Sequence, residues 1–210
     1  MEHNFSVRES LKFGWSETKA HNALLFQVML TFFALQITSA ALDHMLSHSP
    51  LGIASSIILT LIGIWISAGF VLIALKLAEG HTAHYADLFP PMKTVWRFFL
   101  TGVVAGVLIA AGFILLIIPG VYLALRFSMA RFALLDTTLT HQHYIKESLR
   151  KSSEMTQDIK WRLLGFFAIL ILLNIIGALL LLVGLLVTVP VTMLAYAHLY
   201  LKLKNSVESK

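Results

Sequence analysis

The stretch FFLTGVVAGVLIAAGFILLIIPGVYLALRFSMARFALLD, residues 98–136, decides the fold class of this chain. It contains no charged residue before Arg126. A helix needs about 20 mainly apolar residues to cross the roughly 30 Å hydrocarbon core of a bilayer, and this stretch is long enough to do so twice. Pro119-Gly120 interrupts it, and proline followed by glycine is typical of a tight turn. The stretch therefore predicts two membrane spans, over residues 98–118 and 121–136, joined at that turn.

The composition extends this prediction to the whole chain. Hydrophobic residues make up 58% of the 210 residues and charged residues 13%, with a mean hydropathy of +0.80, whereas a soluble domain contains about 25% charged residues. Four further apolar stretches are long enough to cross a membrane, at residues 22–42, 52–75, 163–183 and 184–201. We expect an all-α, polytopic membrane protein that forms a single domain, residues 1–210. Its six transmembrane helices would form three hairpins, accompanied by short cytoplasmic amphipathic helices.

The positions of the basic residues predict the orientation. Apart from Arg126 and Arg131, every Lys and Arg falls in the N-terminal tail, in the C-terminal tail, or between spans two and three or four and five. The three other connections contain none. Because cytoplasmic loops carry an excess of Lys and Arg, both termini are expected in the cytoplasm, and a bacterial inner (plasma) membrane is the expected location. The N-terminus shows no cleavable export signal, since its first apolar run is too long for one.

Charged stretches that precede the spans suggest a weak internal repeat. Residues 7–12, VRESLK, resemble residues 145–150, IKESLR, and residues 85–89 lie at the equivalent place before the third span. The repeat predicts a unit of one surface helix and one hairpin, used three times. In the first unit, Ser6 and Glu9 fit a capping box.

The first surface helix allows two interpretations. It either lies at the lipid headgroups with its basic residues near anionic lipid, or packs on the bundle as a short cytoplasmic helix. The candidate residues for lipid-surface contact are Arg8, Lys12, Lys19, Lys146, Arg150 and Lys151.

Three ionisable residues in span four are candidates for lipid or anion binding: Arg126, Arg131 and Asp136. A charged side chain within a span costs at least about 2.5–3.5 kcal/mol on insertion scales and usually faces a cavity or a partner. Arg126 is expected about 9 Å below the outer end and Arg131 about 7–8 Å deeper. In the functional interpretation they form a polar track, with guanidinium groups binding phosphate. In the alternative, Arg131 reaches the cytoplasmic interface and Arg126 pairs with backbone carbonyls or a carboxylate.

Other classes of site lack the residues they need. No histidine pair has a third ligand at a familiar metal-binding spacing, so no metal is expected. The chain has no cysteine and no Gly-rich phosphate loop, nucleophile elbow or paired carboxylates at an active-site spacing. We therefore expect no catalytic residues, no cofactor, no enzymatic activity and no nucleic-acid partner. Gly102, Gly106 and Ala110 recur at four-residue spacing, which predicts close helix packing within the bundle or between copies.

Two motifs carry a resemblance. Residues 118–128, IPGVYLALRFS, resemble the central motif of bacterial multi-pass proteins related to the membrane domain of glycerophosphoryl diester phosphodiesterases. Residues 148–156, SLRKSSEMT, followed by WRLLG at 161–165, are similar to the second motif of that family. Arg131 stands where the family often has proline, and Ser153 where it often has tryptophan. The resemblance implies the membrane architecture. The soluble phosphodiesterase domain of some relatives has no counterpart in the 210 residues, so no hydrolase activity is implied.

Two hypotheses about function follow. In the first, the chain binds or transports an anionic lipid or a small amphipathic molecule through Arg126 and the basic cytoplasmic helices. In the second, it is a structural or interaction module that docks a partner through the cytoplasmic segment 140–162. The expected partners are membrane lipids and either another membrane protein or a second copy of the chain.

Overall fold

The structure, a computed structural model, describes residues 6–46, 49–136, 143–157, 159–180 and 183–208, and all regular secondary structure within them is helical. The helices are α1 (Val7–Ala20), α2 (Asn22–Met45), α3 (Pro50–Ala78), η1 (Tyr85–Leu88), α4 (Met92–Leu115), α5 (Ile117–Phe127), α6 (Ala130–Asp136), α7 (Tyr144–Thr156), α8 (Lys160–Leu179) and α9 (Leu185–Glu208).

Six helical segments within the described residues are long and apolar enough to cross a membrane: α2, α3, α4, α5 together with α6, α8 and α9. The predicted all-α class and the six apolar helices are therefore confirmed. Large apolar side chains remain exposed on these segments, for example Ile114 at 86% and Leu179 at 77%. Apolar surface on this scale needs lipid rather than water around it, as in a multi-pass membrane protein.

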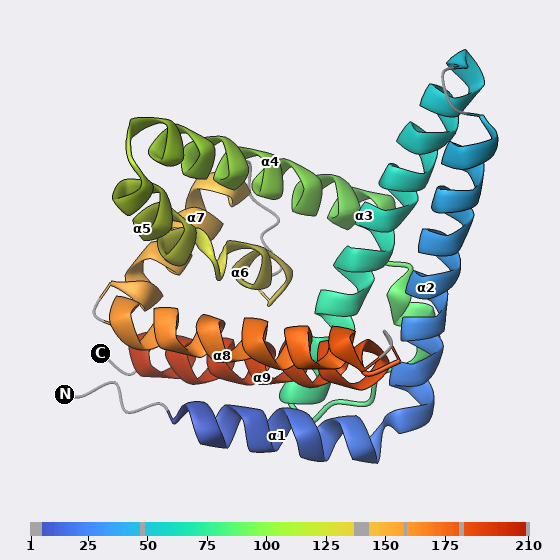
Figure 1. Cartoon of the computed structure of the whole chain (residues 1–210). Helices are drawn as coiled ribbons and strands as arrows, with labels where there is room; N and C mark the ends of the chain where they lie inside the picture. Colours follow the sequence, from blue (N-terminus) through green and yellow to red (C-terminus); the bar gives the residue numbers. More distant parts are fainter. Residues whose placement is uncertain (1–5, 47–48, 137–142, 158, 181–182, 209–210) are drawn as a thin grey trace.

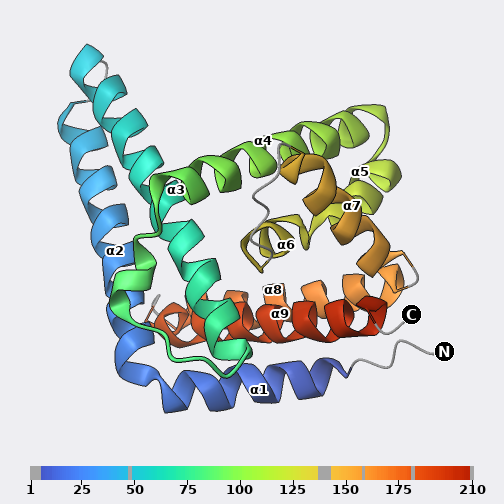
Figure 2. The same ribbon diagram turned by 180° about the vertical axis from the view of Figure 1, so that it is seen from behind.

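The six apolar helices do not form one parallel array. Successive helices contact each other, α2 with α3, α4 with α5 and α8 with α9. Figures 1 and 2 show α2 and α3 side by side, rising across the direction followed by α4, α8 and α9. The α2–α3 pair therefore forms one wall of the molecule, with α4 meeting α3 near its middle and α8 and α9 lying beside its lower part.

The turn between spans three and four lies at a different place from the predicted one. Leu116, with extended backbone angles (φ −169°, ψ 158°), separates α4 from α5, whereas Pro119 and Gly120 are inside α5. Proline is tolerated there because the first N–H groups of a helix have no intrahelical partner. A Cβ atom on Gly120 would lie 2.4 Å from the ring of Phe113. The glycine therefore permits the close approach of α5 to α4 instead of forming the turn.

The fourth predicted span is broken. α5 ends at Phe127, α6 begins at Ala130, and hydroxyl groups of α7 satisfy the backbone at the break. Ser152 Oγ donates to the carbonyl oxygen of Arg126 at 2.7 Å and accepts from the backbone N–H of Met129 at 3.2 Å. Buried backbone groups need such partners, so α7 stabilises the change of direction between α5 and α6.

Helix α1 packs along α9. A Cβ atom on Gly14 would lie 2.3 Å from the carbonyl oxygen of Val191, so only glycine allows this approach. Ser6 precedes α1, but its side chain makes no capping hydrogen bond. The predicted capping box is therefore wrong. The Glu9 carboxylate instead accepts a hydrogen bond from Lys202 of α9 at 2.5 Å, and this bond lowers the pKa of Glu9.

Candidate functional site

An open, mainly apolar cavity of about 890 Å³ lies among α2, α3, α4, α6 and α9. Aromatic and aliphatic side chains supply most of its lining, including Phe32, Phe70, Phe98, Ile109 and Met193. Few polar groups reach it. Ligand pockets in proteins typically measure about 300–1,000 Å³ and combine an apolar lining with a small number of polar groups. The cavity has the size and character of a binding site for an apolar molecule.

Arg131, on α6, is the cationic residue in the lining of this cavity. Its guanidinium group lies over the ring of Phe98, with the Cζ atom 5.1 Å from the ring centroid. No described carboxylate lies within ion-pair distance of it. Such a cation–π contact stabilises the charge only in part. Arg131 therefore presents a positive charge to an apolar space, and an anionic group would complete its coordination.

The glycines of α4 make room for this arrangement. A Cβ atom on Gly102 would lie 2.5 Å from Nη2 of Arg131, while one on Gly106 would meet no atom within 4 Å. Both glycines line the cavity. Gly102 admits Arg131 of α6 at close range, as predicted for packing within the bundle, whereas Gly106 meets no other segment of the chain. Packing between copies stays a prediction. The small residues leave space for the Arg131 side chain and for the cavity itself.

The hydroxyl group of Tyr196 ties the cavity wall to the break between α5 and α6. Tyr196 OH donates to the carbonyl oxygen of Ser128 at 2.6 Å, and both residues line the cavity. The ring of Tyr196 packs edge-on against Phe132, with the centroids 4.6 Å apart. These contacts hold the start of α6 against α9, and they thereby determine where the Arg131 side chain leaves the helix.

Arg126 has different neighbours. Its Nε donates to Ser153 Oγ on α7 at 2.7 Å, and the adjacent Tyr122 accepts a hydrogen bond from Lys160 at the start of α8. The sequence predicts Arg126 near the outer end of span four. In the structure it lies beside α7 and the start of α8, because α5 folds back against those segments instead of leading away from them.

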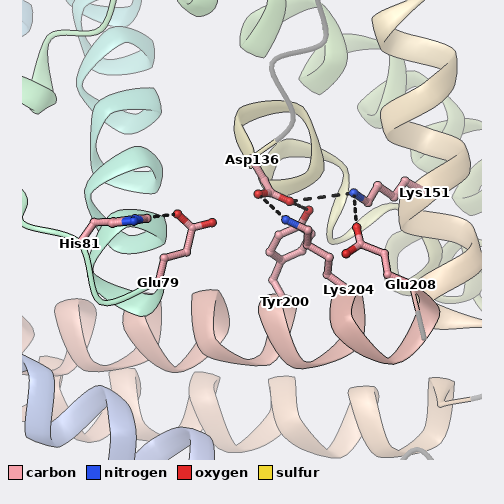
Figure 3. Close-up of polar contacts among 7 residues, drawn as sticks. All are labelled: Glu79, His81, Asp136, Lys151, Tyr200, Lys204 and Glu208. Atoms are coloured by element: carbon pink, nitrogen blue, oxygen red, sulfur yellow. Dashed lines mark hydrogen bonds and ion pairs between the residues drawn. The ribbon is translucent and has the colours of Figure 1, made fainter.

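Asp136 forms the centre of an ionic cluster that joins α6, α7 and α9 (Figure 3). Its side chain is 3% exposed. It accepts hydrogen bonds from Tyr200 OH at 2.6 Å and from Lys204 Nζ at 2.9 Å, and Lys151 Nζ lies 4.0 Å away. Lys151 also pairs with Glu208 at 3.5 Å. Asp136 thus anchors α6 and lies apart from the cavity. The structure does not bring Arg126, Arg131 and Asp136 together.

The basic residues predicted to contact the lipid surface also differ in their surroundings. Arg8, Lys12 and Lys19 are exposed along α1, and Lys146 and Arg150 are exposed on α7. Lys151, as described, belongs to the Asp136 cluster. The exposed positions are open to lipid headgroups, and their predicted contact with lipid stays a prediction.

The predicted docking segment 140–162 is only partly described, because residues 140–142 and 158 lie outside the described residues. Within it, α7 turns Ser148, Ser152, Met155 and Thr156 inward against its own chain. A partner would therefore meet the charged outer face of α7.

Among the residues with described positions, no three His, Asp or Glu side chains gather closely enough to hold a metal ion. Comparisons of the chain with protein-family models, with curated proteins and with solved structures find no match. The cavity and its charges are therefore the features of the molecule that bear on its function.

Proposed function

We propose that this chain is a multi-pass plasma-membrane (inner-membrane) protein that binds an anionic amphipathic molecule, such as an anionic lipid, in the cavity beside Arg131. The observation that carries the proposal is a guanidinium group without a described carboxylate partner on the wall of an apolar cavity of about 890 Å³. A charge in such surroundings is costly unless it is paired. An anionic ligand supplies the pair, and its apolar part fills the remaining space.

The chemistry of the two parts defines the ligand class. A guanidinium group binds carboxylate or phosphate through two parallel N–H donors, which a lysine does not offer. The aromatic and aliphatic lining favours a hydrocarbon chain over a sugar or a nucleotide. Fatty acids and anionic lipids combine both properties. Transport of such a molecule across the membrane would begin with its binding in this cavity.

The proposed orientation places both termini in the cytoplasm. It is supported by the segregation of Lys and Arg along the chain. It is also supported by ion pairs that join three of the basic segments to one another. Glu9 of the N-terminal helix pairs with Lys202, and Lys151 of α7 pairs with Glu208 near the C-terminus. These ion pairs hold the three basic segments next to one another in the fold, as the proposed orientation requires.

The orientation is tested by labelling single cysteines, since the chain has none of its own. We expect a membrane-impermeant maleimide to label Met45→Cys on intact cells, because Met45 is 78% exposed at the α2–α3 tip. Arg150→Cys, on the exposed face of α7, should react only after the membrane is permeabilised. Labelling of both positions from the same side would contradict the proposed orientation.

The ligand class is tested by comparing the binding of oleate with that of oleyl alcohol, its uncharged counterpart, by native mass spectrometry of the full chain in an uncharged detergent. We expect the wild-type chain to prefer oleate by about tenfold, since a charge-assisted pair contributes on this order. Arg131→Gln should abolish the preference and Arg131→Lys should keep part of it. Arg126→Gln is the matched control and should keep all of it. An undiminished preference in Arg131→Gln would overturn the proposal.

A further inference from the structure

A second group of cations lies on the other side of the α5–α6 break. Arg126 of α5 donates through Nε to Ser153 Oγ of α7 at 2.7 Å. One helical turn earlier in α5, Tyr122 contacts Lys160 of α8. The Nζ atom of Lys160 lies 3.1 Å from the Tyr122 hydroxyl group and 4.2 Å from the centroid of the Tyr122 ring. Three helices therefore bring two cations and two hydroxyl groups to one place.

No acid among the described residues balances the charges in this group. None of the carboxylates that the structure describes lies within ion-pair distance of Arg126 or Lys160. Arg126 engages Ser153 through Nε alone, so the terminal nitrogens of its guanidinium group have no described acceptor. Lys160 contacts Tyr122, and Arg126 lies one helical turn further along α5. An anion that reached both cations would balance their charges.

The donors fit a phosphate group. A guanidinium fork, an ammonium group and hydroxyl groups are the donors that proteins use for phosphate oxygens. Tyr122 is 41% exposed, so the group is accessible from outside. Trp161, next to Lys160, is 86% exposed, and exposed tryptophan side chains gather at the depth of lipid headgroups.

We infer that Tyr122, Arg126, Ser153 and Lys160 form a binding site for a phosphate group, supplied by the headgroup of an anionic phospholipid or by a soluble phosphate ester. This site goes beyond the proposed function and does not depend on it. Arg131 contacts Phe98 and Gly102 of α4, and neither residue belongs to the phosphate site. The proposed oleate site and the proposed phosphate site can therefore be tested independently.

The test measures the affinity of the full chain in an uncharged detergent for phosphatidylglycerol, phosphatidylcholine and glycerol 3-phosphate by native mass spectrometry. We expect Arg126→Gln/Lys160→Gln to weaken phosphatidylglycerol binding at least about tenfold. Phosphatidylcholine should bind weakly to the wild-type chain and to the variant. Arg150→Gln is the matched control, since Arg150 is an exposed cation on α7 that pairs with Glu154, and it should change phosphatidylglycerol affinity less than about twofold.

The source of the phosphate follows from the same data. Binding of phosphatidylglycerol without binding of glycerol 3-phosphate assigns the site to lipid. Cation-dependent binding of glycerol 3-phosphate alone assigns it to a soluble ester. Equal affinities in the wild-type chain and the double variant, for both ligands, would overturn the inference. The conservative Arg126→Lys variant guards against a folding defect, since it keeps the charge and should retain more affinity than Arg126→Gln.

Discussion

Arg126 and Arg131 are five residues apart in a stretch of sequence that looks like one span, yet they have opposite surroundings. Arg126 is hydrogen-bonded to α7 among hydroxyl groups and a second cation. Arg131 faces an apolar cavity and contacts an aromatic ring and a glycine. The break at Ser128 and Met129 causes the difference, because it redirects the chain between the two arginines. Two arginines of one apolar segment can therefore have different surroundings.

The largest effect is expected for the carboxylate that anchors α6. Asp136→Ala leaves Lys204 and the buried Tyr200 without their acceptor, and breaking a buried ion pair from one side costs about 3–5 kcal/mol. Thermal unfolding in detergent should show this loss. Oleate binding at Arg131 should fall with it, while phosphatidylglycerol binding at Arg126 should persist below the unfolding temperature.

Asp43→Ala is the control for that variant. Asp43 accepts a hydrogen bond from Ser56 at the exposed α2–α3 tip, so its loss should have a far smaller effect on unfolding. Equal destabilisation by the two variants would contradict the anchoring role of Asp136.

A smaller effect is expected for the hydroxyl group that holds Arg126. Ser153→Ala removes one hydrogen bond to a charged group, worth about 1.5–3 kcal/mol at most. We expect phosphatidylglycerol affinity to fall several-fold, with oleate binding unchanged. Ser148→Ala, whose hydroxyl bonds the carbonyl oxygen of Ile145 in its own helix, is the control. A larger loss of oleate binding than of phosphatidylglycerol binding would show that the two arginines share a site.

The smallest effect concerns a region that touches neither arginine. Burial raises the pKa of Asp87, but the backbone N–H of His84 and the ammonium group of Lys76 outweigh it, so the pKa lies below its usual 3.8. A carboxyl group whose pKa is lower in the folded state stabilises that state at pH values above its pKa in the unfolded chain. This contribution disappears as the pH falls through the pKa of the folded state. We expect a modest loss of stability below about pH 4.

Asp87→Asn should remove that pH dependence, measured as the unfolding temperature in detergent across the acidic range. Neither oleate nor phosphatidylglycerol affinity should change in this variant near neutral pH. An unfolding temperature that falls equally in the wild-type chain and in Asp87→Asn would assign the pH dependence to other groups.

The sequence predicts the elements better than it predicts their surroundings. The apolar stretches mark the long helices because length and hydropathy are local properties. The prediction of a turn at Pro119-Gly120 is wrong. Proline in the first turn of α5, followed by glycine at a close approach to α4, gives the same sequence pattern as a turn. The break after Phe127 depends on hydroxyl groups of α7 that lie more than twenty residues away in the chain.

The candidate sites show the same division. Arg126, Arg131 and Asp136 stand out in the sequence because charge is rare within apolar stretches. Their separate roles cannot be seen in the sequence, because the partners come from distant helices. Tyr200 and Lys204 reach Asp136 from α9, and Ser153 reaches Arg126 from α7. Contacts between distant segments leave no pattern in a single sequence.

The proposed function depends on the cavity beside Arg131, and filling that cavity tests it most directly. Gly106 lines the cavity, and Gly165 lies on the exposed face of α8. A Cβ atom at either position meets no atom within 4 Å. We predict that Gly106→Phe abolishes oleate binding, measured by native mass spectrometry, while Gly165→Phe leaves it unchanged. Undiminished oleate binding in Gly106→Phe, or equal loss in both variants, would contradict the proposed function.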